Sequence, residues 1–224
     1  MHHLRRAVTA KMAAGLAVVT VGTLAGCGAP AYNYAADKAD HAYFKVPSGW
    51  HEVSPQFVAQ AQNLLTRSFA GAAGGALAWS QAYAAASSPS SVSLLDAANK
   101  PVVYASVQNL KLSLRGELSF NVMRDLLFPV TPGARQQAAA AGATLPGFQS
   151  ISYNLITTKY NMRGINELFE YDVNGQPDAF DLTVLTNAAT TKLYLLLVQC
   201  YQNCFVSNEK QIATVVNSFT VRGS

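Results

Sequence analysis

The densest group of acidic side chains lies in the stretch NELFEYD, which holds Glu167, Glu170 and Asp172. Paired carboxylates can transfer protons or bind a cation. In a β-strand, Glu170 and Asp172 would share one face, while Glu167 would lie on the other with Phe169 and Tyr171. The interpretation that we favour is a solvated strand face, with these acids opposite basic side chains such as Lys159 or Arg163.

Histidine offers little further chemistry. Beyond the basic N-terminus the chain has only His41 and His51, and His51 lies beside Trp50 and Glu52. A His–carboxylate contact is conceivable there, but we favour an exposed histidine on a strand edge. The sequence also lacks Gly-x-Ser-x-Gly, His-Glu-x-x-His, P-loop and Rossmann motifs. We therefore expect no catalytic, cofactor-binding or metal-binding residues.

A different chemistry is predicted at Cys27. Basic residues open the chain, and an apolar run from 12 to 24 follows, shorter than the roughly 20 residues that span a bilayer. The sequence Leu24-Ala25-Gly26-Cys27 resembles the bacterial lipobox. The resemblance implies that the Cys27 thiol carries diacylglycerol, and that residues 1–26 are a signal peptide cleaved after Gly26. The protein would then be anchored on the extracytoplasmic face of the cell membrane. An ordinary signal peptide followed by a chance cysteine is the alternative.

The other two cysteines are Cys200 and Cys204, in VQCYQNCFV. An exported chain meets an oxidising compartment, so we expect a disulfide that pins a tight turn. A redox-active pair is the alternative. Redox pairs usually have the spacing Cys-x-x-Cys, which is one residue shorter. A metal site would need further ligands, and the two histidines are far away in sequence.

The charge pattern excludes a nucleic-acid partner. The whole chain has 16 basic and 12 acidic residues, with a net charge of +4. Removal of the signal peptide takes away Arg5, Arg6 and Lys11, which brings the mature chain close to neutrality. No basic stripe remains for binding to phosphates.

These residues must be positioned by one α+β domain. Residues 27–40 are small and polar and predict a flexible tether, which leaves 41–224 as the domain. Alternating or continuous apolar patterns predict strands around 43–46 and over 77–85, 101–110, 148–158, 162–173, 178–186 and 192–200. Helical spacing predicts helices over 55–67, from 117 to 129 and from 208 to 219, and a short Ala-rich helix within 134–143. We expect an antiparallel central sheet with helices on both faces, an α/β/α sandwich.

Two segments carry a family resemblance. YFKVPSGWHEVS resembles the opening of the PsbP/Mog-like domain, and IATVVNSFTV resembles its last helix and final strand. Small actinobacterial lipoproteins of the LpqN type resemble this design. The resemblance implies that Trp50 and Phe219 are core anchors, and that the protein is a non-enzymatic binding or accessory protein with no cofactor.

Two functions remain open at this point. The first is an accessory or binding module of the cell envelope, which predicts an exposed apolar or aromatic patch without converging polar groups. Its partner would be an unidentified protein or envelope component. The second is a carrier of a small apolar or lipid-like ligand, which predicts a sizeable apolar cavity. The segments 70–76 and 134–143 would then act as gates.

Overall fold

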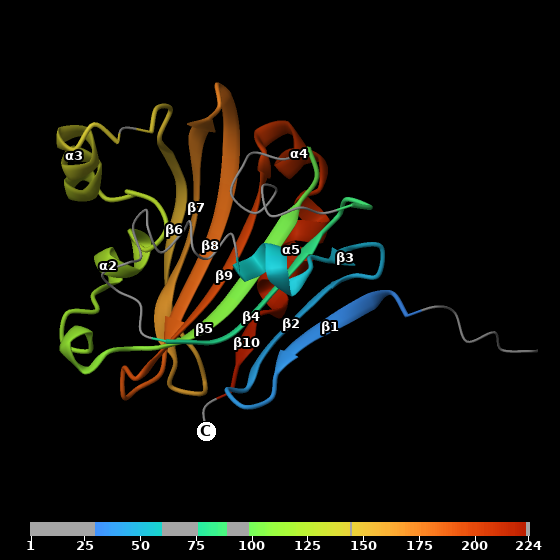
Figure 1. Cartoon of the computed structure of the whole chain (residues 1–224), viewed down its shortest axis with the longest axis horizontal. Coiled ribbons are helices and arrows are strands. Elements are labelled where there is room, and N and C mark those ends of the chain that lie inside the picture. The colour runs from blue at the N-terminus through green and yellow to red at the C-terminus, as the bar shows by residue number, and fades with distance from the viewer. Residues whose placement is uncertain (1–29, 60–75, 89–98, 144, 223–224) are drawn as a thin grey trace, which may run out of the picture.

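The computed structural model describes residues 30–59, 76–88, 99–143 and 145–222, and these form an α+β domain with two antiparallel sheets (Figure 1). A seven-stranded sheet has the strand order β3 (His51–Glu52), β4 (Leu77–Ala84), β5 (Val102–Asn109), β9 (Lys192–Tyr201), β8 (Gln176–Thr186), β7 (Arg163–Val173) and β6 (Gln149–Thr157). A three-stranded sheet contains β1 (Tyr32–Asp37), β2 (Ala42–Pro47) and β10 (Thr220–Val221). The labelled helices are η3 (Leu112–Leu114), α2 (Phe120–Arg124), α3 (Pro132–Ala140), α4 (Gln202–Ser207) and α5 (Glu209–Ser218).

The predicted strands of the large sheet are confirmed within a few residues. The β7–β8 hairpin shows why. Val173 pairs with Gln176, so the turn consists of Asn174 and Gly175 alone, with φ of 51° and 77°. Asparagine and glycine tolerate positive φ, and the two-residue turn that they form matches the twist of the flanking strands. The turn therefore fixes the register of the longest hairpin.

The predicted helices are found at the expected positions in the sequence, but their lengths differ from those predicted. Residues 55–59 are helical, and the rest of the predicted helix lies outside the described residues. α2 has only five residues. The Asp125 side chain accepts hydrogen bonds from the backbone N–H groups of Val130 and Thr131 at 2.8 and 2.7 Å and from the Thr131 hydroxyl at 2.6 Å. These bonds hold the segment after α2 in a tight loop, so the helix ends early.

The C-terminal helical region starts earlier than predicted. Asn208 precedes α5 as expected, but α4 lies before it, over residues predicted as a turn. Among the described residues, no helix is long and apolar enough to cross a membrane.

The prediction of a tether over 27–40 is wrong for its second half. Residues 32–37 form β1, which pairs with β2 from Tyr32↔Pro47 to Asp37↔Ala42. Ala35 and Asp37 are buried while their neighbours are exposed or half-buried. This alternation makes β1 part of the domain, and small residues suit it because their side chains pack closely against the layer beneath.

One face of the large sheet packs against α2 and the loop that follows it. Met123 of α2, with Leu126, Leu127 and Val130, joins inward-facing residues of β4, β5, β7, β8 and β9 in one cluster. Phe128, which is half-buried, packs against this cluster, with ring centroids 5.8 Å from Phe169 and 4.5 Å from Phe180. The space between the sheet and α2 is therefore packed with aromatic rings.

The other face is covered by both helices and strands. Ile212 and Val215 of α5 pack there with Phe44 of β2 and Trp50, against Tyr83 and the opposite faces of β5 and β9. The expected α/β/α sandwich is therefore met only in part on this face, because the three-stranded sheet lies beside α5 in the covering layer (Figure 1). Trp50 is buried as a core anchor, and Phe219 packs half-buried at the edge of the same core.

Candidate functional site: the β6 edge and the groove beside α4

The acidic group of β7 does not form one site. Glu167 is fully buried, which corrects the expectation of a solvated face. Its carboxylate accepts two hydrogen bonds of 2.7 Å from the Arg124 guanidinium and one of 3.1 Å from the Ser150 hydroxyl. The partner is thus Arg124 of α2 rather than Lys159 or Arg163. A carboxylate held in this way is structural and is not available to a substrate.

The Arg124–Glu167 pair joins three elements. The hydrogen bond to Glu167 raises the pKa of Arg124, and the guanidinium lies 4.5 Å from the centroid of the Tyr153 ring in β6. Two-pronged contacts of this kind fix orientation as well as distance. The pair therefore ties α2 to β7 and holds the edge strand β6 through Ser150 and Tyr153.

The other two acids lie on the opposite face of β7, as the strand period predicts. Glu170 is nearly buried, with the Gln202 amide 3.4 Å away as donor. The Asp172 carboxylate lies directly over Gly147, where any β-carbon would clash. The two acids have different neighbours, and no cluster of three or more potential metal ligands occurs in the described part of the chain.

Asp181 of β8 is a further acid on that face, and sequence reasoning did not single it out. Burial raises its pKa to about 6, an effect opposed by the hydrogen bond from the Asn166 amide at 2.6 Å. Asn166 also lies 3.1 Å from the Thr183 hydroxyl. In the sequence it stands between Phe180 and Leu182, and in the sheet it pairs with Leu168 of β7.

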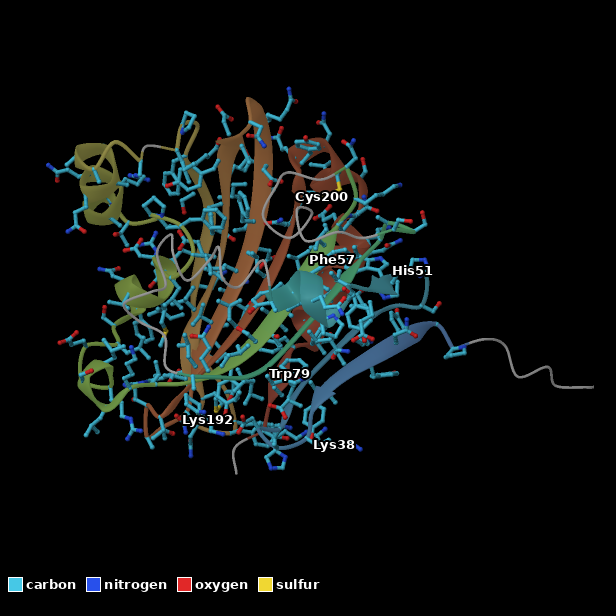
Figure 2. The ribbon with its side chains drawn as sticks, in the orientation of Figure 1. Lys38, His51, Phe57, Trp79, Lys192 and Cys200 are labelled. Carbon is cyan, nitrogen blue, oxygen red and sulfur yellow. A yellow bond between two sulfur atoms is a disulfide. The ribbon has the colours of Figure 1, made fainter. Side chains whose placement is uncertain are left out.

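The two described histidines, His41 and His51, lie in different surroundings. His51 is exposed on the short strand β3, at the periphery of the sheet (Figure 2). His41 lies in the β1–β2 turn with a φ of 53°. It lines a polar pocket of about 420 Å³ together with residues of the 158–162 and 187–191 turns and Arg222. In that pocket the Asp40 carboxylate is already ion-paired with Lys192.

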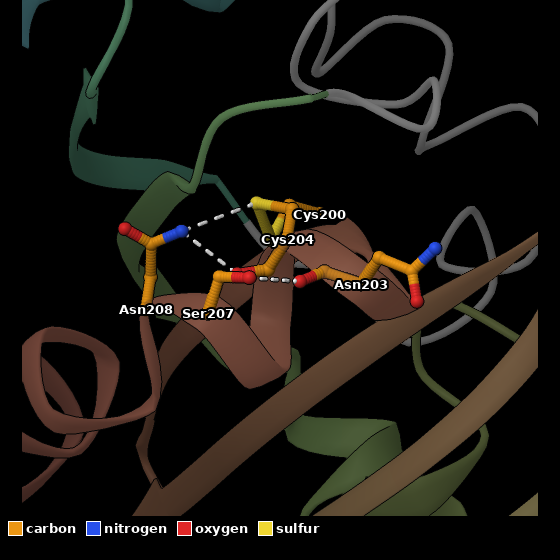
Figure 3. The surroundings of a disulfide bond; sticks show 5 residues. All are labelled: Cys200, Asn203, Cys204, Ser207 and Asn208. Carbon is orange, nitrogen blue, oxygen red and sulfur yellow. Dashed lines mark hydrogen bonds between the residues drawn. A yellow bond between two sulfur atoms is a disulfide. The ribbon is translucent and has the colours of Figure 1, made fainter.

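Cys200 and Cys204 form a disulfide between the end of β9 and α4 (Figure 3). Both cysteines are buried. The Asn208 amide donates to the Cys204 carbonyl at 2.7 Å, and the Ser207 hydroxyl donates to the Asn203 carbonyl at 2.7 Å. The bond and its neighbours thus attach α4 firmly to the central strand of the sheet. Cys27 lies outside the described residues.

An apolar groove lies between α4 and the strands β6, β7 and β8. We call it the β6–α4 groove. Its volume is about 280 Å³, and its apolar walls are formed by Ile151, Leu168, Ala179, Phe205 and Val206. Glu170, Gln202 and Glu209 add polar groups to its lining.

Large apolar side chains are exposed around this groove and along β6. The exposed fraction is 47% for Ile151, 40% for Tyr153, 61% for Leu155 and 70% for Val206. Tyr153 and Leu155 lie opposite Glu167 and Ile165 of β7, on the α2 side of the strand. An edge strand with apolar side chains on both faces, next to an apolar groove, can bind another chain through side chains and backbone alike.

No family model matches the sequence, and no curated protein does. Solved structures of similar overall shape include the cyanobacterial PsbP of Synechocystis sp. PCC 6803, at 16% identity and a TM-score of 0.49, covering 90% of this chain and 98% of that chain. LpqN of Mycobacterium tuberculosis, described as involved in cell envelope biogenesis, is 13% identical with a TM-score of 0.46, covering 88% of this chain and 87% of that chain.

The Saccharomyces cerevisiae Ran-binding protein Mog1p is also similar, at 7% identity and a TM-score of 0.42, covering 86% of this chain and 96% of that chain. At these levels of identity and TM-score, none of the likenesses carries an argument about function. The site must be interpreted from its own geometry.

The buried Arg124–Glu167 ion pair predicts how substitutions at these positions change the stability of the protein. Arg124→Met leaves the Glu167 carboxylate buried without its cation, which should lower the free energy of unfolding by about 3–5 kcal/mol. The double variant Arg124→Met/Glu167→Met should recover most of that loss, because an apolar pair can replace a buried ion pair. Urea unfolding of the purified protein measures both. Lys111→Met, at an exposed position, is the control. A loss for Arg124→Met no larger than about 1 kcal/mol, as for exposed pairs, would contradict the structural role.

The raised pKa of Asp181 predicts how the stability of the protein depends on pH. Its pKa in the folded protein is about 6, above the 3.8 of an unperturbed aspartate, so the folded state binds this proton more tightly than the unfolded state. The free energy of unfolding should therefore fall as pH rises from about 4 to about 6 and stay lower above that range. Asp181→Asn should flatten this part of the curve and stabilise the protein at pH 7 by up to about 3 kcal/mol.

The measurement is urea unfolding of wild type and variant at a series of pH values. Glu209→Gln, at an exposed position in α5, is the matched control and should leave the slope in place. An Asp181→Asn profile parallel to that of the wild type would show that Asp181 is ionised normally in the folded protein.

Proposed function

We propose that the chain is an exported lipoprotein, held on the extracytoplasmic face of the cell membrane through Cys27, that acts as a non-enzymatic accessory or binding module of the cell envelope. The domain would be of the PsbP/Mog-like type, as its two end motifs suggest. Its partner would be a protein or another component of the envelope, reached through the surface around β6 and α4.

The observation that carries the binding role is the exposed apolar surface of β6 and the β6–α4 groove. Its walls are mostly apolar, as expected of a binding module, and Glu170, Gln202 and Glu209 add polar groups to the groove. The acids that could do chemistry are occupied elsewhere, since Glu167 is paired with Arg124 and Asp40 with Lys192. Export is supported by the Cys200–Cys204 disulfide, which an oxidising compartment favours.

The alternative, a carrier of a small apolar ligand, has less support. The space between the large sheet and α2 is filled by the rings of Phe128, Phe169 and Phe180. The β6–α4 groove has a volume of about 280 Å³, at the lower end of the roughly 300–1,000 Å³ of ligand pockets. Of the two proposed gates, 134–143 includes most of the ordered helix α3, and 70–76 lies almost entirely outside the described residues.

The membrane anchor is tested by labelling cells with an alkyne analogue of palmitate. The wild-type chain should incorporate the label, because an acyl chain is added to Cys27 during lipoprotein processing. Cys27→Ala should lose the label and retain residues 1–26, which is visible as a larger mass. Cys204→Ser, which removes the other kind of cysteine, is the control and should stay labelled. A wild-type chain without label, or a Cys27→Ala chain that keeps it, would refute the lipid anchor.

A further inference from the structure

The strand β6 is an edge strand with little of the usual protection, since its pairing with β7 is irregular only between Ser150 and Ser152, near the start of the strand. It ends the seven-stranded sheet, and eight of its nine residues are exposed, with Ile156 half-buried. Its sequence, QSISYNLIT, contains no charged residue and no proline. Every second residue of such a strand directs its backbone N–H and C=O groups away from the sheet. An exposed edge strand pairs readily with another chain. Soluble proteins normally prevent this pairing with lysine, proline or a very short edge strand.

The other described edges are less suited to pairing. At the opposite end of the same sheet, β3 has two residues. In the three-stranded sheet, β10 also has two, and β1 has six, ending at Asp37 with Lys38 next in the chain. Figure 1 shows β6 on the far side of the domain from β1. β6 is therefore the longest uncharged edge among the described strands.

We propose that β6 pairs in antiparallel fashion with β6 of a second copy of this chain, joining two seven-stranded sheets into one. Two copies can approach at this edge without placing like charges opposite each other, which would be destabilising. The pairing satisfies the outward backbone groups of both strands. It also brings the exposed apolar residues Tyr153 and Leu155 of each copy next to those of the other, so it covers apolar surface as well.

The charges at the two ends of β6 favour this arrangement over a parallel one. Beyond Thr157 lie Lys159 and Arg163, and Arg163 pairs with Thr157 across the sheet. Beside Gln149, at the other end, lie Glu170 and Asp172. Antiparallel pairing about a two-fold axis sets the basic end of each copy beside the acidic end of the other. Parallel pairing would set basic residues beside basic residues at one end and acidic residues beside acidic residues at the other.

The two-fold axis stands perpendicular to the sheet, so both copies keep their α4 side on the same face of the joined sheet. The contact is isologous, with the same edge used by both copies, and closes after two copies. The inference goes beyond the function proposed above, because it assigns the apolar edge of β6 to a second copy and leaves the β6–α4 groove to the proposed envelope partner.

The test is cysteine cross-linking of the full chain in its own membrane. Each residue of Gln149–Thr157 is replaced by cysteine in turn, and mild oxidation is followed by electrophoresis without reductant. A residue on the two-fold axis lies opposite its own copy, with β-carbons about 4.5–5.5 Å apart. A residue two places away is separated from its copy by about 13 Å, because a strand rises about 3.3 Å per residue. We therefore expect cross-linked dimer to peak at one position and to fall off on both sides.

Tyr34→Cys on the edge of β1 and Leu112→Cys in η3 are matched controls, since both positions are exposed. Adding Leu155→Lys to the peak variant should abolish the cross-linked dimer, whereas adding Leu112→Lys should not. Thermal unfolding of the purified variants shows that each remains folded. No cross-linking along β6, cross-linking no stronger than in the controls, or cross-links only to a chain of different mass would overturn the proposal.

Discussion

Two neighbouring strands, β5 and β9, have apolar side chains on both faces, and this double burial constrains the rest of the fold. Leu193, Leu195 and Leu197 of β9 face one core cluster, while Leu196 and Val198 face another. A strand of this kind is stable only when both faces are covered. The chain meets the requirement with α2 and its loop on one side, and with α4, α5 and the three-stranded sheet on the other. α2 lies closest to β7 and β8, and α5 lies closest to β2 and β9. β6, at the margin of the sheet, stays largely exposed. The surface available for binding is therefore the part of the sheet that these layers do not cover.

Two strong local links then hold that surface in place. The Arg124 guanidinium holds Glu167 of β7, and the same pair reaches Ser150 and Tyr153 of β6. The Cys200–Cys204 disulfide attaches α4 to the end of β9 (Figure 3). One wall of the β6–α4 groove is thus held by an ion pair and the other by a covalent bond. A preformed surface loses less conformational entropy when a partner binds.

The sequence predicted the strands of the large sheet well, because alternation and turn chemistry are local. Asn174-Gly175 predicted the β7–β8 hairpin, and the strand period correctly separated Glu167 from Glu170 and Asp172. The same period put Glu167 on the face of Phe169 and Tyr171, which was the available signal that it is buried. Its partner could not be predicted, because Arg124 lies 43 residues away and meets it only after α2 packs on the sheet.

The remaining errors have the same origin. The stretch YNYAAD has a composition typical of a tether, yet it becomes β1 because β2 offers it a pairing edge. The groove was not predicted because its walls come from β6, β7, β8 and α4, and α4 was itself expected to be a turn. Whether a segment forms a strand or a groove wall depends on its pairing partners and tertiary neighbours. A local sequence pattern does not contain that information.

The proposed protein is a lipid-anchored module that binds through its surface and carries no small molecule within it. Native mass spectrometry of the wild-type chain, extracted from its own membrane in mild detergent, tests this most directly. We predict a chain that starts at Cys27, carries acyl groups, is lighter by the hydrogens lost in the Cys200–Cys204 bond, and releases no small molecule on denaturation. A chain without acyl groups would contradict the anchor. A small molecule that departs on denaturation would contradict the binding-module assignment in favour of a carrier.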